Sequence, residues 1–297
     1  TCMPELPEVE TIARQLNSVL VGQRTVGVEV KQGRRFKGNK QLVVGRKIIK
    51  VWRRAKMAII ELSDKLQATS NKIFLLIHLK MTGQLVYQAT SNKRQATRRI
   101  AGGHPAADWV RELPSKHTRV IVKLNNGSLF FNDQRMFGWM KVVDRDQLER
   151  EFDNYGPDII DRAVTEDYFY KTLQKSRRAV KLVITDQARL AGVGNIYANE
   201  GLWWARIDPR RPAKRVSREE SNKLLTGLRK VVEEGIKYGG ATASDDKFVQ
   251  ATGLGGKYQE HFLAYEREGE RCTRCGGVIK KVRLGGRGTY YCASCQL

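Results

Sequence analysis

The sequence predicts an α+β protein of more than one domain, with a β-rich N-terminal half and a helical C-terminal half. Its 297 residues are enough for two domains with a sizeable core. β-Branched and aromatic runs dominate up to about residue 150, and apolar residues at helical spacing replace them afterwards. The segment NYGPD at Asn154–Asp158 marks this change, so it indicates a boundary between domains.

The first element is expected to be an amphipathic helix in and after MPELPEVET, the segment that begins at Met3. Pro7 is acceptable in the first helical turn, and Gly22 ends the helix. Apolar residues recur at helical spacing at Val9, Ile12, Leu16 and Leu20.

The region after this helix is expected to form short strands, and strands at this spacing indicate a β-sandwich or a barrel. The segment KLNNGSL predicts a hairpin that turns at Asn126-Gly127. The runs that predict strands are VGVEVKQ, KIIKVW, MAIIEL, KIFLLIHLKMTGQLVY, TRVIVKL and GSLFFND.

Residues from about 161 to 240 are expected to be helical. Thr165 and Ser217 are suitable N-cap residues, and Ser217 with Glu220 has the spacing of a capping box. The amphipathic helix that follows has its apolar residues at Leu224, Leu225, Leu228, Val231, Val232 and Ile236.

The chain is strongly basic, with 54 Lys and Arg against 31 Asp and Glu and a net charge of +23. This charge indicates a polyanionic partner, most often nucleic acid, although a ribosome-associated or merely very soluble protein is an alternative. No apolar run approaches the ~20 residues that span a bilayer. Glu5, Glu8 and Glu10 stand where a signal peptide would carry positive charge, so we expect a cytoplasmic protein with reduced thiols.

Four cysteines near the C-terminus have the spacing Cys272-x2-Cys275-x16-Cys292-x2-Cys295. Two such pairs offer four thiolates to a tetrahedral zinc ion, and four thiolates leave no open position for a reacting water. The sequence therefore predicts one structural Zn²⁺, with redox-active or fortuitous CxxC pairs as the alternative. The intervening RLGGRGTYY predicts a β-hairpin with Arg287 at its tip.

Two further segments are candidates for contact with nucleic acid. In DQARLAGVGNIYANE, Gly192 and Gly194 allow a close turn before a helix that starts at Asn195, where amide groups could hold a phosphate. A plain turn between helices is the alternative.

The segments HLKMTGQL and NDQRMFG contain His78 and Met81, and Arg135 and Phe137, respectively. Met81, Arg135 and Phe137 could wedge into a base stack and replace an extruded base. A satisfied polar histidine and a core methionine are the alternatives.

Four motifs occur together and in order: MPELPEVET, HLKMTGQL, DQARLAGVGNIYANE and the four-cysteine motif with GGRGT. In these motifs the chain resembles the formamidopyrimidine-DNA glycosylase (Fpg/Nei) family of bacterial type. The resemblance implies a catalytic β-sandwich domain with a leading helix at 4–150 and a linker at 151–160. It also implies a helix–two-turns–helix domain at 161–265, with a lesion-capping loop at 241–258, and a zinc finger at 266–297.

The resemblance implies a bifunctional DNA glycosylase/AP lyase that excises oxidised purines, such as 8-oxoguanine and formamidopyrimidines, from duplex DNA. The family uses a Schiff base on an N-terminal proline, followed by β,δ-elimination, and Pro4 matches that nucleophile. Glu5 matches the acid/base residue and Glu8 a supporting carboxylate. Lys56 matches a lysine that contacts the phosphate of the lesion, and it would be the next candidate for the nucleophile.

The resemblance also implies a set of DNA contacts. Phosphate contacts match His78, Asn195 and Arg287, and more weakly Lys181. The residues that fill the gap left by the flipped base match Met81, Arg135 and Phe137. The expected partner is damaged double-stranded DNA, and the expected state is a monomer in the bacterial cytoplasm at the nucleoid.

The chain departs from the family pattern at three places. The family usually reads DPRRFG where Met136 replaces the second arginine here, and Glu266 stands where the family tends to have glycine. Thr1 and Cys2 precede the methionine, and we expect them to lie outside the natural start. While they remain, Pro4 nitrogen is an amide and cannot act as a nucleophile.

Three alternatives stay open at this point. An endonuclease VIII-like glycosylase for oxidised pyrimidines shares the same start and mechanism. A damaged-DNA binder that cannot cut would result if Pro4 stays blocked. A ribosomal zinc-ribbon protein would fit the charge and the cysteines but not the N-terminal segment.

Overall fold

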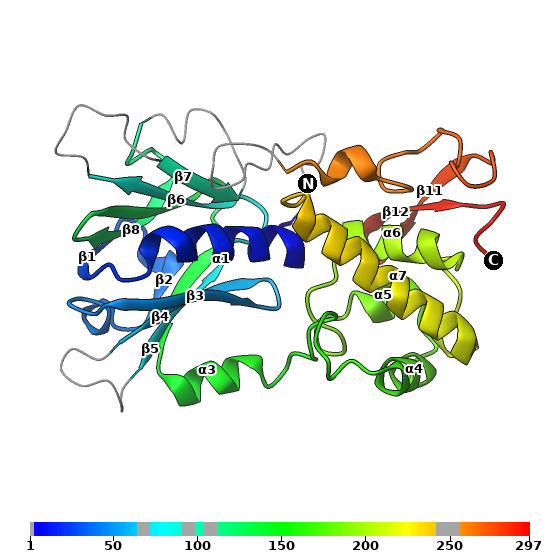
Figure 1. Ribbon diagram of the computed structural model, residues 1–297, viewed down its shortest axis with the longest axis horizontal. Helices are drawn as coiled ribbons and strands as arrows, with labels where there is room; N and C mark the ends of the chain where they lie inside the picture. Colours follow the sequence, from blue (N-terminus) through cyan, green and yellow to red (C-terminus); the bar gives the residue numbers. More distant parts are fainter. Residues whose placement is uncertain (1–2, 64–71, 91–98, 104–111, 242–255) are drawn as a thin grey trace. The chain divides into compact units, whose positions relative to one another are not determined.

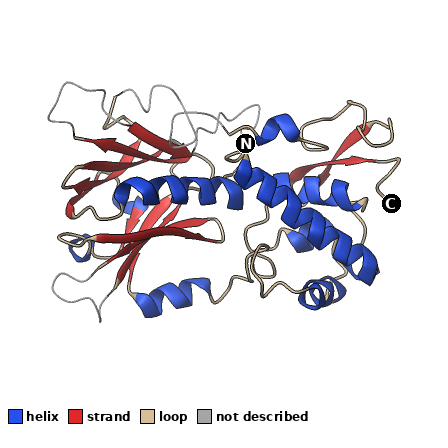
Figure 2. Ribbon diagram, in the orientation of Figure 1, coloured by secondary structure: helices blue, strands red, loops and turns tan. Residues whose placement is uncertain are grey.

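The computed structural model describes residues 3–63, 72–90, 99–103, 112–241 and 256–297 (Figures 1 and 2). It divides into two compact units. Unit 1 comprises Thr1–Asp153 and Tyr238–Lys257, and unit 2 comprises Asn154–Lys237 and Tyr258–Leu297. The domain bounds expected from the family stay a prediction.

Unit 1 is built on two five-stranded sheets, in which neighbours are antiparallel except β2 and β10. The order in the first sheet is β1 (Thr25–Val30), β8 (Thr118–Leu124), β9 (Gly127–Asp133), β6 (Gly83–Ala89) and β7 (Arg99–Gly103). The order in the second sheet is β2 (Phe36–Lys37), β10 (Trp139–Val143), β5 (Ile73–His78), β4 (Met57–Leu62) and β3 (Ile48–Arg54). The predicted sandwich is confirmed, but the sequence runs did not indicate β2, β7 or β10.

Helix α1 (Leu6–Leu20) contacts β3 and β4 of one sheet and β7 of the other (Figure 1). Its predicted apolar face is fully buried in one core with side chains of both sheets. Burial of each such Leu or Ile contributes about 1.5–3 kcal/mol. The helix is therefore part of the sandwich core, and its N-terminus is held firmly by that packing.

Strand β5 is buried on both faces. Ile73, Leu75 and Ile77 point into the sandwich core, whereas Phe74 and Leu76 pack with Leu148 of helix α3 (Arg145–Phe152). This burial on both sides explains why its sequence is an unbroken apolar run instead of an alternating one.

Two connections between the sheets lie side by side. The chain passes from β5 to β6 through Leu79–Thr82 and from β9 to β10 through residues 134–138. Since β6 pairs with β9 in one sheet and β5 pairs with β10 in the other, both connections leave and enter neighbouring strands. The cross-strand pairs next to them are Gly83 with Asp133 and His78 with Trp139.

The predicted hairpin between β8 and β9 is present, but its turn lies one residue earlier than expected. Leu124 pairs with Gly127, so Asn125 and Asn126 form the turn. Gly127 is the first residue of β9, where only glycine fits because a Cβ would lie 2.4 Å from the carbonyl oxygen of Gln88. The glycine serves strand packing, which its sequence neighbours do not reveal.

Unit 2 contains the predicted helices and a C-terminal hairpin. Its helices are α4 (Glu166–Gln174), α5 (Val180–Ile184), α6 (Asn195–Ala205) and α7 (Arg218–Lys237), and its strands are β11 (Ile279–Leu284) and β12 (Arg287–Cys292). Short 3-10 turns lie at Gly33–Arg35 and Lys40–Leu42 in unit 1, and at Ala213–Arg215 and Tyr258–His261 in unit 2. Among the helices described in both units, none combines the length and the apolar composition needed to cross a bilayer.

The tight connection between β5 and β6 generates a stability prediction. A Cβ at Gly83 would lie 2.3 Å from the carbonyl oxygen of Leu79, whose hydrogen bond from the Gly83 N–H closes the turn. Gly83→Ala should therefore reduce the free energy of unfolding by about 1–3 kcal/mol. Gly33→Ala, where a Cβ meets nothing within 4 Å, is the control in urea titrations. Equal stability of the two variants would contradict the described turn.

Candidate functional site

Two buried carboxylates stand at the start of α1. Glu5 is the N-cap residue, Glu8 is in the first turn, and each side chain is 2% exposed. Glu8 Oε2 accepts the backbone N–H of Glu5 at 2.8 Å, and its Oε1 accepts the N–H of Ala241 at 2.8 Å. Pro4, directly before them, is also buried. Glu8 thus joins the start of the chain to the residue that precedes 242–255, where most of the expected capping loop lies outside the described residues.

A basic cluster surrounds the end of β5. Lys56 is buried in the two-residue turn between β3 and β4, next to Ala55 in a left-handed conformation at φ 51°. His78 Nδ1 accepts the backbone N–H of Lys80 at 3.1 Å, so the neutral ring carries its proton on Nε2. Burial, with help from the ammonium groups of Lys80 and Lys56, lowers the pKa of His78 to about 3. His78 is therefore a neutral hydrogen-bond donor at physiological pH.

The two adjacent connections bring together the residues predicted to enter the base stack. The Arg135 guanidinium lies 5.2 Å from the centre of the Phe137 ring, and both side chains are exposed. Phe137 is 50% exposed, so it is not part of the core. Met81 is partly exposed on the neighbouring connection. Thr82, the next residue, links the two connections, because its Oγ1 accepts the backbone N–H of Arg135 at 3.0 Å.

In unit 2, a buried lysine joins the start of α6 to the C-terminal hairpin. Lys181 is 2% exposed, and its Nζ donates to Asn195 Oδ1 at 2.7 Å, to Gly288 O at 3.1 Å and to Thr289 Oγ1 at 2.7 Å. Asn195 Nδ2 also donates to Gly288 O, at 3.1 Å. Arg287, directly after the Gly285–Gly286 turn, is exposed beside this network.

A buried carboxyl group supports the same region. Glu200 in α6 is fully buried and accepts the backbone N–H groups of Leu263, Ala264 and Tyr265 at 2.7–2.9 Å. Burial raises its pKa to about 7, although the three N–H donors oppose the shift. Asn199, one residue earlier, accepts the N–H of Tyr290 at 2.8 Å. These two side chains attach the segment before the cysteines, and strand β12, to α6.

The four cysteines are gathered as zinc requires. Their sulfur atoms all lie within 4.8 Å of one another, with Cys272 and Cys295 at 3.9 Å and Cys275 and Cys292 at 3.5 Å. A tetrahedron with Zn–S distances of about 2.3 Å has sulfur–sulfur edges of about 3.8 Å. The four sulfur atoms are therefore close enough together to hold one zinc ion.

Electrostatics also favour a cation among these thiols. Burial opposes ionisation of Cys272, but backbone N–H groups and the indole N–H of Trp203, 3.3 Å from its sulfur, outweigh it and lower its pKa to about 6. Burial and the neighbouring thiols raise the pKa of Cys295 to about 12. Adjacent thiols resist becoming thiolates together unless a metal ion compensates their charge.

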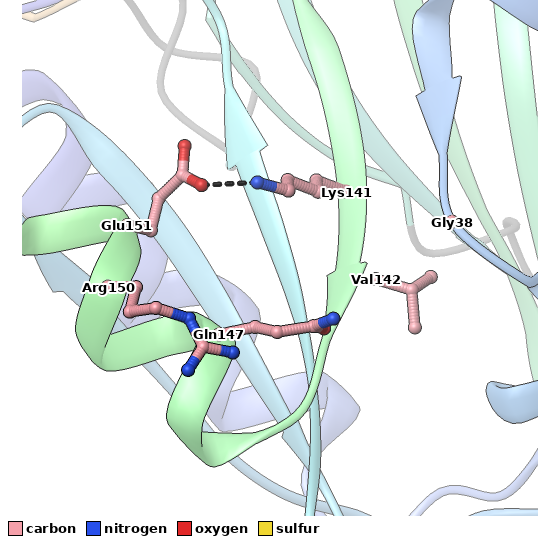
Figure 3. Close-up of a pocket in the computed structure, with 6 residues that line it drawn as sticks. All are labelled: Gly38, Lys141, Val142, Gln147, Arg150 and Glu151. Carbon is pink, nitrogen blue, oxygen red and sulfur yellow. Dashed lines mark hydrogen bonds and ion pairs between the residues drawn. The ribbon is translucent and has the colours of Figure 1, made fainter.

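A shallow cavity of about 300 Å³ lies elsewhere on unit 1, between β10 and α3 (Figure 3). Lys141 and Glu151 form an ion pair at its edge. Its described lining consists of Gly38, Lys141, Val142, Gln147, Arg150 and Glu151. No predicted site residue is among them, and we assign the cavity no role.

Three family models match successive parts of the chain. The formamidopyrimidine-DNA glycosylase N-terminal domain matches residues 3–140, the H2TH domain of the same enzyme matches 155–247, and the zinc finger found in FPG and IleRS matches 269–297. The formamidopyrimidine-DNA glycosylase of Pelotomaculum thermopropionicum is 37% identical over 302 residues, which cover 99% of each chain. The chain belongs to the formamidopyrimidine-DNA glycosylase family.

Solved structures of this family agree with the described fold. The Fpg protein of Lactococcus lactis, in complex with DNA that contains N7-benzyl-Fapy-dG, has a TM-score of 0.82 at 31% identity, and 99% of each chain is covered. The same protein, in complex with DNA that contains an oxidised pyrimidine, has a TM-score of 0.81 at 30% identity and 99% coverage of each chain. The protein is thus a DNA-binding glycosylase of base excision repair, with an N-terminal domain of helix and sheets, an H2TH domain and a zinc finger.

Membership of the glycosylase family identifies the four cysteines as zinc ligands. The family finger covers all four cysteines, and their geometry fits one ion, so the cluster is a structural zinc site. The ion would hold the two CxxC segments together and compensate four thiolates.

Sequence reasoning missed four polar residues that the structure buries next to the predicted glycosylase residues. They are Thr82, Asp133, Asn199 and Glu200. Each lies inside or beside a motif already singled out, and a buried polar side chain needs partners. Their position in the motifs was the available signal, but the sequence does not reveal which partners they have.

Zinc removal should unfold the finger and weaken DNA binding. Metal analysis should find about one zinc per chain, and Cys292→Ser should lower both zinc content and DNA affinity, the latter by roughly tenfold or more. Ser294→Ala, which changes an exposed residue between two ligands and keeps all four thiols, is the matched control. A metal-free protein with full affinity would contradict the assignment.

His78 should make the protein sensitive to mild acid. Its folded-state pKa of about 3 lies below the ordinary 6.5, so the unfolded chain binds the proton first, and stability is lost as pH falls below about 6.5. This group alone should cost about 2 kcal/mol between about pH 7 and about pH 5. His78→Asn keeps a hydrogen-bond acceptor near the position of Nδ1. Its free energy of unfolding, measured by urea titration at both pH values, should fall correspondingly less between them than that of the wild type. His117→Asn, a change at a partly exposed histidine, is the control, and identical pH dependence in wild type and His78→Asn would refute the prediction.

Proposed function

We propose that the protein is a bifunctional DNA glycosylase/AP lyase that excises oxidised purines, including 8-oxoguanine and formamidopyrimidines, from duplex DNA. The observation that carries the proposal is the start of α1, where Pro4 directly precedes the buried carboxylates of Glu5 and Glu8 in a member of this family. The name of the P. thermopropionicum relative and the Fapy-dG complex of the L. lactis protein support this class of lesion.

Pro4 acts as the nucleophile once its nitrogen is the chain terminus. A secondary amine uses its lone pair to attack C1′ of the damaged nucleotide, and the base departs with its bonding electrons. The amine proton passes to the departing base, directly or through water, and opening of the sugar at the C1′–O4′ bond then leaves a cationic iminium between Pro4 and C1′. Because the proline nitrogen already carries two carbon substituents, this iminium has no N–H proton to lose and keeps its positive charge.

Glu5 acts as the acid/base residue at the same place. It protonates the sugar ring oxygen while the base leaves and afterwards receives a proton from C2′, which the iminium makes acidic. The C2′ electron pair then expels the 3′ phosphate, and a second elimination expels the 5′ phosphate. Glu8 positions Glu5 through its backbone N–H.

The remaining predicted residues hold the DNA. Lys56 and His78 lie near enough for the ammonium to affect the histidine pKa, which suits a shared role as cation and neutral donor to a phosphate. Asn195 at the N-terminus of α6 and exposed Arg287 suit a second phosphate contact. Buried Lys181 acts indirectly here, by orienting Asn195 and the hairpin. Met81, Arg135 and Phe137 fill the gap that the extruded base leaves.

Oxidised pyrimidines are a second candidate class of substrate. The specific observation is that the L. lactis Fpg protein, 30% identical to this chain, has been solved with DNA that contains an oxidised pyrimidine. Incubation with duplexes that carry 8-oxoguanine, an abasic site or an oxidised pyrimidine would rank the classes by excision rate.

Activity should depend on a free amine at Pro4. Protein that begins at Pro4 should form a borohydride-trapped covalent adduct with lesion-containing duplex, whereas protein that keeps Thr1-Cys2-Met3 should bind the duplex and form none. Pro4→Gly should retain part of the adduct through its primary amine. Glu5→Gln should still bind but lose base excision by about 100-fold or more.

The terminus must be checked by mass spectrometry before and after the reaction. If the extended form, with its terminus intact, cuts as fast as the form that begins at Pro4, the nucleophile is another residue and Lys56 is the next candidate. If neither form cuts any of the three duplexes but both bind them, the protein is a damaged-DNA binder.

A further inference from the structure

The two connections that carry Met81, Arg135 and Phe137 are joined by buried polar contacts. Thr82 Oγ1 donates to Asp133 Oδ1 at 2.5 Å, and both residues are almost inaccessible, at 2% and 0% exposure. Thr82 directly follows Met81, and Asp133 lies two residues before Arg135. The contact therefore crosses between the connections next to the residues predicted to enter the base stack.

Each of the two buried residues makes a second contact with the connection that follows β9. Thr82 Oγ1 accepts the backbone N–H of Arg135 at 3.0 Å, and Asp133 Oδ2 accepts the N–H of Gly138 at 2.6 Å. The Asp133 carboxylate thus joins the end of β9 to the last residue of the connection. Hydrogen bonds to a buried carboxylate are among the stronger ones in proteins, so this connection has little freedom to move.

The backbone of the same connection is also constrained by packing and by its dihedral angles. A Cβ at Gly138 would lie 2.7 Å from the Phe131 ring and 3.1 Å from Asp133 Oδ2, so this end is packed without spare room. Met136 adopts a left-handed φ of 56°, which turns the chain between Arg135 and Phe137. A tightly fixed backbone here carries exposed apolar side chains, with Phe137 50% and Met136 39% exposed.

We propose that Thr82 and Asp133 are positioning residues that lock the two connections together, so that Met81, Arg135 and Phe137 enter the base stack as one rigid unit. Packing of the core does not by itself require the backbone to be fixed where its side chains are exposed. A rigid wedge avoids the entropy cost of ordering three separate side chains at the moment of base extrusion. The proposal rests on the function proposed above, since it assigns these residues a part in extrusion.

The central test compares Thr82→Ala with Thr82→Ser, which differ only by the hydroxyl group. The substrate is an 8-oxoguanine duplex with 2-aminopurine beside the lesion, whose fluorescence rises when the stack opens. Protein that begins at Pro4 is used throughout. Thr82→Ser should extrude the base at nearly the wild-type rate, whereas Thr82→Ala should be roughly tenfold slower because the Asp133 carboxylate and the Arg135 N–H lose their shared partner.

A second substrate separates positioning from general damage to the fold. When the lesion faces an abasic analogue in the other strand, unstacking costs less, and the defect of Thr82→Ala should shrink to about twofold. Thr25→Ala removes another buried threonine hydroxyl of unit 1, far along the sequence from both connections, and should leave both rates unchanged. Thr82→Val, which has nearly the shape of threonine, replaces Thr82→Ala if the smaller side chain does not fold.

The outcomes are distinguishable. Extrusion by Thr82→Ala at the wild-type rate, or an equal slowing on both substrates, would overturn the positioning role while the function stands. Failure of the wild-type protein to extrude or excise any lesion would instead overturn the proposed function.

Discussion

The functional side chains of unit 1 depend on one topological constraint, the pairing of β6 with β9 in one sheet and of β5 with β10 in the other. This double pairing places two sheet-to-sheet connections next to each other, so Thr82 and Arg135 meet although they are distant in sequence. The register of the strand pairing matters as much as the order of the strands. A slip by one residue in the pairing of β6 with β9 would turn Asp133 toward the opposite face of the sheet and separate it from Thr82.

Buried carboxyl groups fix the other functional regions, and both are held by backbone N–H groups. Glu8 uses both oxygens on backbone N–H groups at two distant points of the chain, and Glu200 does the same for three consecutive residues. Burial of such groups is unfavourable unless their hydrogen bonds are satisfied, so they tolerate few alternative arrangements. Their contribution is therefore greater for the uniqueness of the local structure than for its stability.

The sequence allowed the elements with a strong local pattern to be predicted. Helix α1, strands β3, β4 and β8, the four cysteine ligands and the Gly285–Gly286 hairpin all follow from periodicity or spacing within a few residues. Strand β10 was missed because its sequence, WMKVV, is short and follows a turn-rich segment. The partners of Thr82, Lys181 and Glu8 could not be predicted, since each contact joins segments that only the tertiary fold brings together.

The position of Lys181 has a consequence for how this protein can change during evolution. One ammonium group serves a helix start, a strand carbonyl and a strand hydroxyl, so Lys181, Asn195 and Thr289 constrain one another. Replacement of any one of them removes a hydrogen bond and leaves a polar group of another without its partner in a buried environment. The three positions should vary together among homologues, and the zinc-binding hairpin cannot diverge independently of the helix on which it rests.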